Sequence, residues 1–139
     1  MRSLFIGLAL LALTGPLGAT EPLHLDLGNG VRLELTWIPP GEFMMGTDNR
    51  DSDEWPRHRV HITPGFWMGR YEVTQAQWQQ VTGKNPADFR GPTHPEERVS
   101  WEDSHDFLKK LNHLASAQWP AGLQARLPTE AEWDYACRA

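Results

Sequence analysis

Cys137 is the residue whose chemistry is easiest to name, because it is the single cysteine of the 139-residue chain. A lone thiol excludes an internal disulfide and any reaction within this chain that needs two thiols. As a nucleophile or copper ligand it would need a neighbouring base or a second thiolate, and the sequence around it offers neither. Its helical spacing from Trp133 instead predicts a buried structural thiol.

Histidine pairs are the next candidates for a metal site. His58 and His61 lie on a predicted strand, where an odd spacing sends their side chains to opposite faces. His105 and His113 lie on one predicted helix but about 12 Å apart along its axis, which is too far to share an ion. Neither pair predicts a metal centre, and we expect His58 to make a structural hydrogen bond.

The carboxylates that could do acid–base or calcium chemistry fall into two groups. Glu130 and Glu132 occupy the first turn of a predicted helix, where capping and the helix dipole explain them better than catalysis does. The acidic stretch Thr47 to Glu54 would need a tight glycine turn to act as a calcium loop. It contains no glycine, so we expect an exposed, solvated loop.

Tryptophan is unusually frequent, with seven residues in the chain. Five of them could form a ligand platform, but we expect them mainly to anchor the core: Trp37, Trp67, Trp78, Trp101 and Trp133. A glycine-rich phosphate loop, a serine triad and zinc-ligand spacing do not occur in the sequence. We therefore assign no catalytic, cofactor-binding or metal-binding residue in this chain.

Three predicted helices begin with the same capping box, in which a hydroxyl side chain and a residue three positions later satisfy the first amides. The three boxes are Thr74 with Gln77, Ser100 with Asp103, and Thr129 with Glu132. Gly83 is expected to end the first helix. The second carries an apolar stripe at helical spacing, made of Phe107, Leu108, Leu111, Leu114 and Ala115.

The remaining elements are short strands. Two alternating runs, 23–27 and 31–37, flank Gly28-Asn29-Gly30, and a three-residue loop that sets Leu25 opposite Leu33 keeps one face apolar. The proline pair after Ile38 predicts an irregular extended segment over 38–46. Short strands follow at 60–62 and 66–68. Because the helices do not alternate regularly with strands, the pattern indicates an α+β fold.

Residues 1–19 have the character of a secretory signal. Arg2 precedes an apolar run from Leu4 to Leu13, and helix breakers and small residues follow. The run is shorter than the roughly 20 apolar residues that span a bilayer. We therefore expect a cut after Ala19 or Thr20, a folded part over 20–139 that is not held in a membrane, and a periplasmic or secreted location. The net charge of −5 argues against nucleic acid as a partner.

Five segments complete the sequence evidence, and they occur in a fixed order. They are Ile38–Gly46, Glu54–Val60, Tyr71–Trp78, Arg98–Asp103 and Arg126–Trp133. Together they resemble the formylglycine-generating enzyme family, also called sulfatase-modifying factor domains. The resemblance implies an irregular C-type lectin-like fold and covers about the first half of such a domain. Glu96 departs from it, because the family usually has an apolar residue there.

The resemblance also implies a function for the complete domain. Members oxidise a cysteine of a substrate protein to formylglycine or carry out a related oxidative maturation, so a protein or peptide is the implied partner. The copper-binding cysteine pair and the calcium sites of the family lie beyond the segment that resembles Arg126–Trp133. We therefore expect copper and calcium in a complete domain, no cofactor in this chain, and no activity without the second half. A non-catalytic, lectin-like binding or accessory module is the alternative.

Overall fold

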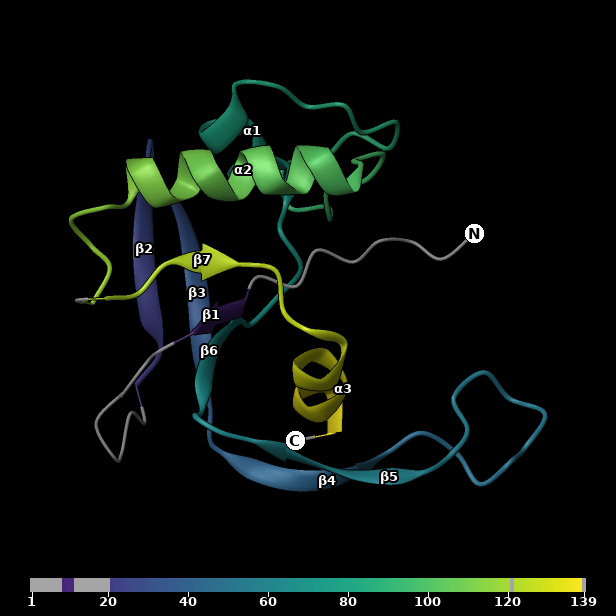
Figure 1. The fold of residues 1–139 in the computed structure, drawn as a ribbon. Helices are drawn as coiled ribbons and strands as arrows, with labels where there is room; N and C mark the ends of the chain where they lie inside the picture. Colours follow the sequence, from purple (N-terminus) through teal and green to yellow (C-terminus); the bar gives the residue numbers. More distant parts are fainter. Residues whose placement is uncertain (1–8, 12–20, 121, 139) are drawn as a thin grey trace.

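The computed structural model describes residues 9–11, 21–120 and 122–138, and it arranges them in one larger and one smaller sheet with three helices (Figure 1). The larger sheet has the strand order β2-β3-β6-β1-β7. Its strands are β1 (Ala9–Leu11), β2 (Leu23–Gly28), β3 (Val31–Ile38), β6 (Phe66–Gly69) and β7 (Ala125–Arg126). The smaller sheet pairs β4 (Gly41–Met45) with β5 (His58–Ile62).

The helices are α1 (Gln75–Thr82), α2 (Trp101–Leu114) and α3 (Glu130–Arg138). In Figure 1, α1 and α2 lie at the end of the β2–β3 hairpin, whereas α3 lies against the β4–β5 ribbon. Helices and strands are therefore mixed without a regular βαβ repeat, which confirms the predicted α+β class. Within the described residues, no helix is long and apolar enough to cross a bilayer.

The β2–β3 hairpin confirms the predicted pairing but not the predicted loop. Leu25 lies opposite Leu33, as expected, and the register shifts between Asp26 and Gly28. Gly28 therefore pairs with Val31, and the turn is the two-residue Asn29-Gly30, with φ of 54° and 77°. The three-residue loop was wrong because a bulge at Leu27 absorbs the extra residue and keeps the leucines on the buried face.

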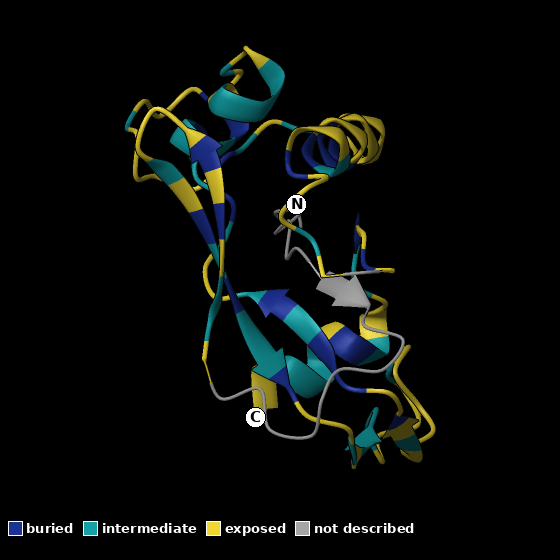
Figure 2. Ribbon diagram, turned by 90° about the vertical axis from the view of Figure 1, so that its left-hand side faces the viewer, coloured by how far each residue is buried: buried dark blue, intermediate teal, exposed yellow. Residues whose placement is uncertain are grey.

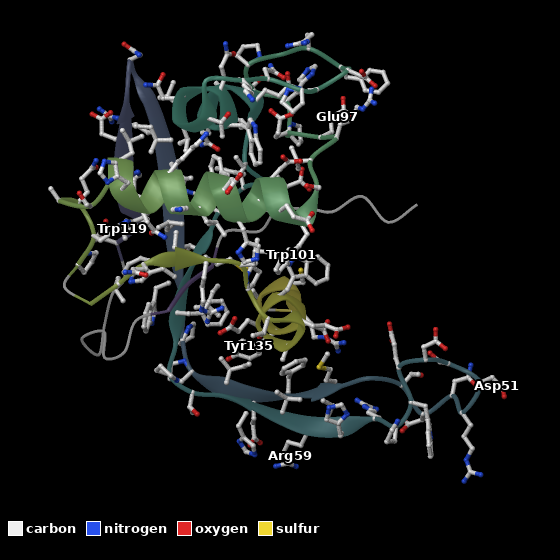
Figure 3. The ribbon with its side chains drawn as sticks, turned by 45° about the horizontal axis from the view of Figure 1, so that its top comes forward. Asp51, Arg59, Glu97, Trp101, Trp119 and Tyr135 are labelled. Atoms are coloured by element: carbon white, nitrogen blue, oxygen red, sulfur yellow. The ribbon has the colours of Figure 1, made fainter. Side chains whose placement is uncertain are left out.

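The segment after the proline pair is more regular than predicted. Residues 41–45 form β4, which pairs with β5 from Gly41 opposite Ile62 to Met45 opposite His58. The irregular segment predicted over 38–46 is therefore wrong, because the prolines interrupt the chain only at 39–40 and a partner strand lies further along the sequence. The acidic loop between β4 and β5 is mostly exposed, and Asp51 lies at its outer end (Figure 3).

All three capping boxes form. The amide of Gln77 donates to the Thr74 hydroxyl over 3.3 Å, and the reciprocal bond from the Thr74 amide measures 2.9 Å. Ser100 with Asp103 and Thr129 with Glu132 repeat this pattern. Gly83 ends α1 at a φ of 77°, which a glycine adopts without strain. Local side-chain chemistry thus determines where each helix begins.

The larger buried cluster joins α1 and α2 to the hairpin (Figure 2). The rings of Trp78 and Phe107 stack with centroids 4.7 Å apart and planes 5° from parallel. They pack against the leucines of β2 and β3, including Leu25 and Leu35, which are fully buried. Aromatic stacking adds to the burial of apolar surface, so this contact holds the helical pair on the sheet.

The smaller cluster lies between β6, the β4–β5 ribbon and α3. Its buried residues are Ile38, Ile62, Phe66 and Met68, and Tyr135 of α3 packs against them. Tyr135 comes so close to β4 that a Cβ added at Gly41 would lie 2.1 Å from the tyrosine hydroxyl oxygen. Figure 3 shows Tyr135 between α3 and the ribbon. Gly41 therefore allows α3 to seat on the ribbon.

The predicted role of the tryptophans holds only in part. Trp78 is buried, and Trp37 and Trp67 are half-buried with an edge-to-face contact at 5.4 Å. Trp101 and Trp133 remain 58% and 41% exposed. Core anchoring is therefore wrong for these two, because no neighbouring element covers most of either side chain among the described residues.

We expect Leu111→Ala to lower the free energy of unfolding by about 2–5 kcal/mol, or to abolish the cooperative transition, because Leu111 is fully buried in the larger cluster. Leu114→Ala is the matched control on the same helix, since Leu114 is 47% exposed. Its effect should stay within about 0.5 kcal/mol. Urea unfolding of the 139-residue chain, followed by tryptophan fluorescence, measures both; equal losses would contradict the assigned core.

Candidate functional site

The candidate site is a cleft between the ends of β3 and β6 and the outer side of α3. Its volume is about 410 Å³. Ile38 of β3 and Met68 of β6 line it with apolar surface. Trp133, Ala136 and Cys137 line it from α3. The cleft is largely apolar with a few polar groups at its edge, which is the usual character of a ligand site.

A second hollow, of about 590 Å³, shares Arg70, Tyr71 and Glu72 with the first. It is otherwise lined by residues at the start of α1 and in the loop before α2, namely Thr74, Gln77, Thr93 and Pro95. The three shared residues connect β6 to α1. Any ligand that extends from one hollow to the other would therefore contact this connection.

Arg70 is the charged group at this connection, and its position is well defined. Its guanidinium contacts the Glu34 carboxylate at 2.5 Å, and its amide donates to the Glu34 carbonyl over 3.0 Å. The guanidinium carbon also lies 5.4 Å from the centre of the Tyr71 ring. The hydrogen bond to Glu34 raises the pKa of Arg70 above its usual value. The site therefore has a permanent cation beside an aromatic ring that is 67% exposed.

Helix α3 is held in place by an ion pair that the sequence did not reveal. Arg126 of β7 donates two hydrogen bonds to the Glu132 carboxylate, at 2.8 and 2.6 Å. The same carboxylate accepts the amide of Thr129 over 2.8 Å. The bidentate pair ties α3 to the large sheet and thereby fixes the wall of the cleft. Its sequence signal is an arginine just before the proline turn that precedes the capping box.

The electrostatics of Glu132 follow from these contacts. Burial acts to raise its pKa, but the hydrogen bonds from Arg126 and Thr129 outweigh burial and hold the pKa below its usual value. Glu132 is therefore ionised at neutral pH. The prediction that it serves capping rather than acid–base chemistry agrees with this geometry.

Cys137 is exposed, so the predicted buried thiol is wrong. The buried side of α3 is formed by Ala131, Tyr135 and Ala136, which pack on the smaller cluster. Trp133 and Cys137 are four residues apart and line the cleft, and Ala136 lies between the cleft and the smaller cluster, because it contributes to both. Sequence periodicity identified an apolar side of this helix, but it could not show which residues a neighbour would cover.

The histidines do not come together. His58 Nδ1 lies 2.9 Å from the Pro56 carbonyl oxygen, which confirms its predicted structural hydrogen bond. His61 lies 3.4 Å from Glu42, and His105 packs on Trp101 with ring centroids 3.9 Å apart. Among the described residues no three His, Cys, Asp or Glu side chains form a possible metal site. The donor set of this part of the chain therefore does not fit a copper centre.

Glu96 is a buried carboxylate in the loop before α2. Its Oε1 accepts the Glu97 amide over 3.1 Å, whereas its Oε2 is buried without a hydrogen-bond partner. Burial raises the pKa of Glu96 above its usual value. The buried side chain of Gln75 organises the nearby loop through hydrogen bonds. Its Nε2 donates to the carbonyl oxygens of Phe89 and Pro95, and its Oε1 accepts the main-chain amide of Gly91. Glu96 is thus buried at a position where the sequence resemblance implies an apolar residue.

Comparison with known proteins identifies the family. The protein-family model described as the sulfatase-modifying factor enzyme 1-like domain matches residues 31–139. The chain belongs to this family. The match contains all five segments on which the resemblance was based, together with the residues of α3 that line the cleft. It therefore covers both hollows and the elements that position them.

The curated relatives that this chain matches are much longer than the chain itself. The formylglycine-generating enzyme of Mus musculus is 30% identical to this chain, and the match covers 73% of this chain and 38% of that protein. Chaperone protein LppX of Paenibacillus barcinonensis is 33% identical over 98 residues, which cover 51% of this chain and 35% of that protein. The chain thus matches only a little over a third of each relative.

Two solved structures share the fold. Treponema denticola variable protein 1 has a TM-score of 0.71 at 23% identity, and the match covers 84% of this chain and 56% of that protein. PvdO from Pseudomonas aeruginosa has a TM-score of 0.63 at 26% identity, covering 86% and 52%. The fold is therefore of the formylglycine-generating enzyme type, an irregular C-type lectin-like fold, as the sequence predicted.

We expect Glu132→Gln to lower the free energy of unfolding by about 1–2 kcal/mol at pH 7, because it removes the charge that Arg126 binds. The folded-state pKa of Glu132 lies below its usual 4.5, so the ion pair stabilises fully above that value and its contribution is lost as the pH falls through the folded-state pKa. The difference in the free energy of unfolding between Glu132→Gln and the parent chain should therefore disappear in acid.

Asp134→Asn is the matched control on the same helix. Asp134 pairs with Arg138 over 3.0 Å at the exposed side of α3, where ion pairs contribute little. Urea unfolding between pH 3 and pH 7 compares the three proteins. A pH-independent loss in Glu132→Gln, or an equal loss in the control, would argue against the Arg126 tie.

We expect Cys137 to react with a maleimide reagent in the native chain nearly as fast as in urea, because its thiol is exposed at the cleft. The measurement is the labelling rate by intact mass, and Cys137→Ser is the control for labelling elsewhere. Strong protection in the native chain would show that the thiol is covered.

Proposed function

We propose that this chain is the N-terminal part of an exported oxidase domain of the formylglycine-generating type. The complete domain would oxidise a cysteine of a substrate protein to formylglycine, or carry out a related oxidative maturation. The observation that carries the proposal is the family match over residues 31–139 together with the likeness to a named formylglycine-generating enzyme. The apolar leader over residues 1–19 supports export to the periplasm or beyond.

The division of labour within the domain follows from the donor set. Oxidation of a cysteine side chain to an aldehyde needs an oxidant, and copper with dioxygen is what the family resemblance implies. The described part of this chain has one exposed thiol and no cluster of metal-binding side chains. We therefore assign the chemistry to the rest of the domain, and to this chain the scaffold and one wall of the substrate cleft.

The cleft suits an extended peptide as the partner. It combines apolar lining from Ile38 and Met68 with two exposed aromatic rings, Tyr71 and Trp133. The Arg70 guanidinium, which its ion pair with Glu34 holds in place, adds hydrogen-bond donors at its edge. Aromatic rings bind peptide side chains at low conformational cost, and a cation orients a carbonyl or carboxylate group. These features support a protein or peptide substrate.

The same exposed rings support the second candidate, a non-catalytic binding module of lectin-like fold. Such a module would hold its ligand against Tyr71 and Trp133 without changing it. Chemical conversion of the ligand separates the two candidates, because a binding module would leave a cysteine peptide intact.

The deciding experiment uses the complete protein, produced from its full reading frame, with copper, dioxygen, a thiol reductant and a synthetic peptide carrying one cysteine. We expect an aldehyde product, detected by its mass change and by trapping with a hydrazine. The matching serine peptide and the 139-residue chain alone are the controls, and neither should give product. Binding without conversion would favour the module, and conversion by the short chain would contradict the assigned division.

A further inference from the structure

The strand β1 occupies an unusual place in the large sheet. It lies between β6 and β7 and is antiparallel to both, with Ala9 opposite Met68 on one side and Arg126 on the other (Figure 1). β7 is the last strand in the order, and β1 is its neighbour in the sheet. Removal of β1 would leave two strand edges facing each other across the width of one strand, about 10 Å apart.

Both walls of this slot are anchored without β1. On one side, β6 is paired with β3 from Gly69 opposite Leu35 to Phe66 opposite Ile38. On the other side, the Asn112 side chain of α2 donates to the Ala125 carbonyl over 2.9 Å and accepts its amide over 2.7 Å. Arg126 is in turn fixed by its ion pair with Glu132. The slot would therefore persist if β1 left.

β1 itself comes from the predicted export leader. Residues 9–11 lie inside the apolar run Leu4 to Leu13, and cleavage after Ala19 or Thr20 would remove them. The rest of the leader, residues 1–8 and 12–19, lies outside the described residues. A folded, exported protein would thus lose the strand that completes its sheet. Open strand edges promote aggregation, so the slot needs another occupant.

We infer that β1 is a placeholder, and that in the exported protein its slot receives a strand from the part of the domain that this chain does not include. This inference rests on the proposed export and on the proposed completion of the domain. The related solved structures support such an occupant, because this chain matches only 56% and 52% of their lengths. Strand addition satisfies main-chain groups on both walls at once.

The slot also sets the character of the incoming strand. Its central residue, opposite Trp67 and Ala125, would face the larger cluster, in which both take part. The residues on either side would face Phe66 and Met68 of the smaller cluster. A strand covered on both faces is apolar throughout rather than alternating. The occupant is therefore a run of at least three consecutive apolar residues, antiparallel to β6.

The test compares the complete protein, produced from its full reading frame with the leader retained, with the 139-residue chain, and it follows amide hydrogen exchange by mass spectrometry. We expect peptides that contain residues 9–11 to be protected in the 139-residue chain and to lose this protection in the complete protein. Peptides covering β6 and β7 should stay protected in both. The readout does not depend on oxidase activity, so an inactive complete protein with a displaced leader would leave this inference standing while the proposed chemistry fails.

A proline in the leader provides the variant. Leu10→Pro removes a main-chain donor inside β1 and weakens the placeholder, so it should raise the amide exchange rate of β6 and β7 in the 139-residue chain about tenfold and leave the complete protein unchanged. Leu13→Pro, outside β1, is the matched control and should leave the exchange rates of both proteins unchanged. A leader that stays protected in the complete protein would overturn the inference. So would equal exchange rates for the two variants of the 139-residue chain, a loss of protection at β6 and β7 in the complete protein, or a slot filled by a second copy of this chain.

Discussion

The structure depends on one strand that belongs to both parts of the core. β3 pairs with β2 on one edge and with β6 on the other, and its eight residues run from the larger cluster into the smaller one. Leu33 and Leu35 pack beneath α1 and α2, whereas Ile38 packs with Phe66. The ladder of β3 therefore connects the two clusters through continuous main-chain hydrogen bonds.

Features determined by residues close in sequence could be predicted. Each capping box joins two residues three positions apart, so composition and spacing were enough to locate the starts of α1, α2 and α3. The pairing of Leu25 with Leu33 followed from alternation alone. The turn was harder to predict, because a two-residue turn with a bulge and a three-residue loop place the same leucines on the same face. Only the backbone conformation distinguishes these two hairpins.

Features that depend on distant partners could not be predicted. β4 becomes a regular strand because β5 lies beside it, and the intervening loop carries no signal of that pairing. The Arg126–Glu132 pair gives a capping residue a second role, because it joins α3 to β7, and helix-capping patterns do not contain that contact. Trp133 and Cys137 had the spacing of core residues, yet the cleft leaves them open. Burial depends on which element comes to lie opposite, and periodicity does not contain that information.

Because Tyr135 lies so close to Gly41, the side chain allowed at position 41 depends on the residue at position 135, almost a hundred residues away. A single methyl group on the ribbon would strike the phenol oxygen at 2.1 Å. A side chain at position 41 would therefore require the tyrosine ring to turn away or a smaller residue to replace it. Homologues with a side chain at this position of the ribbon should accordingly place the ring differently or have a smaller residue in its place.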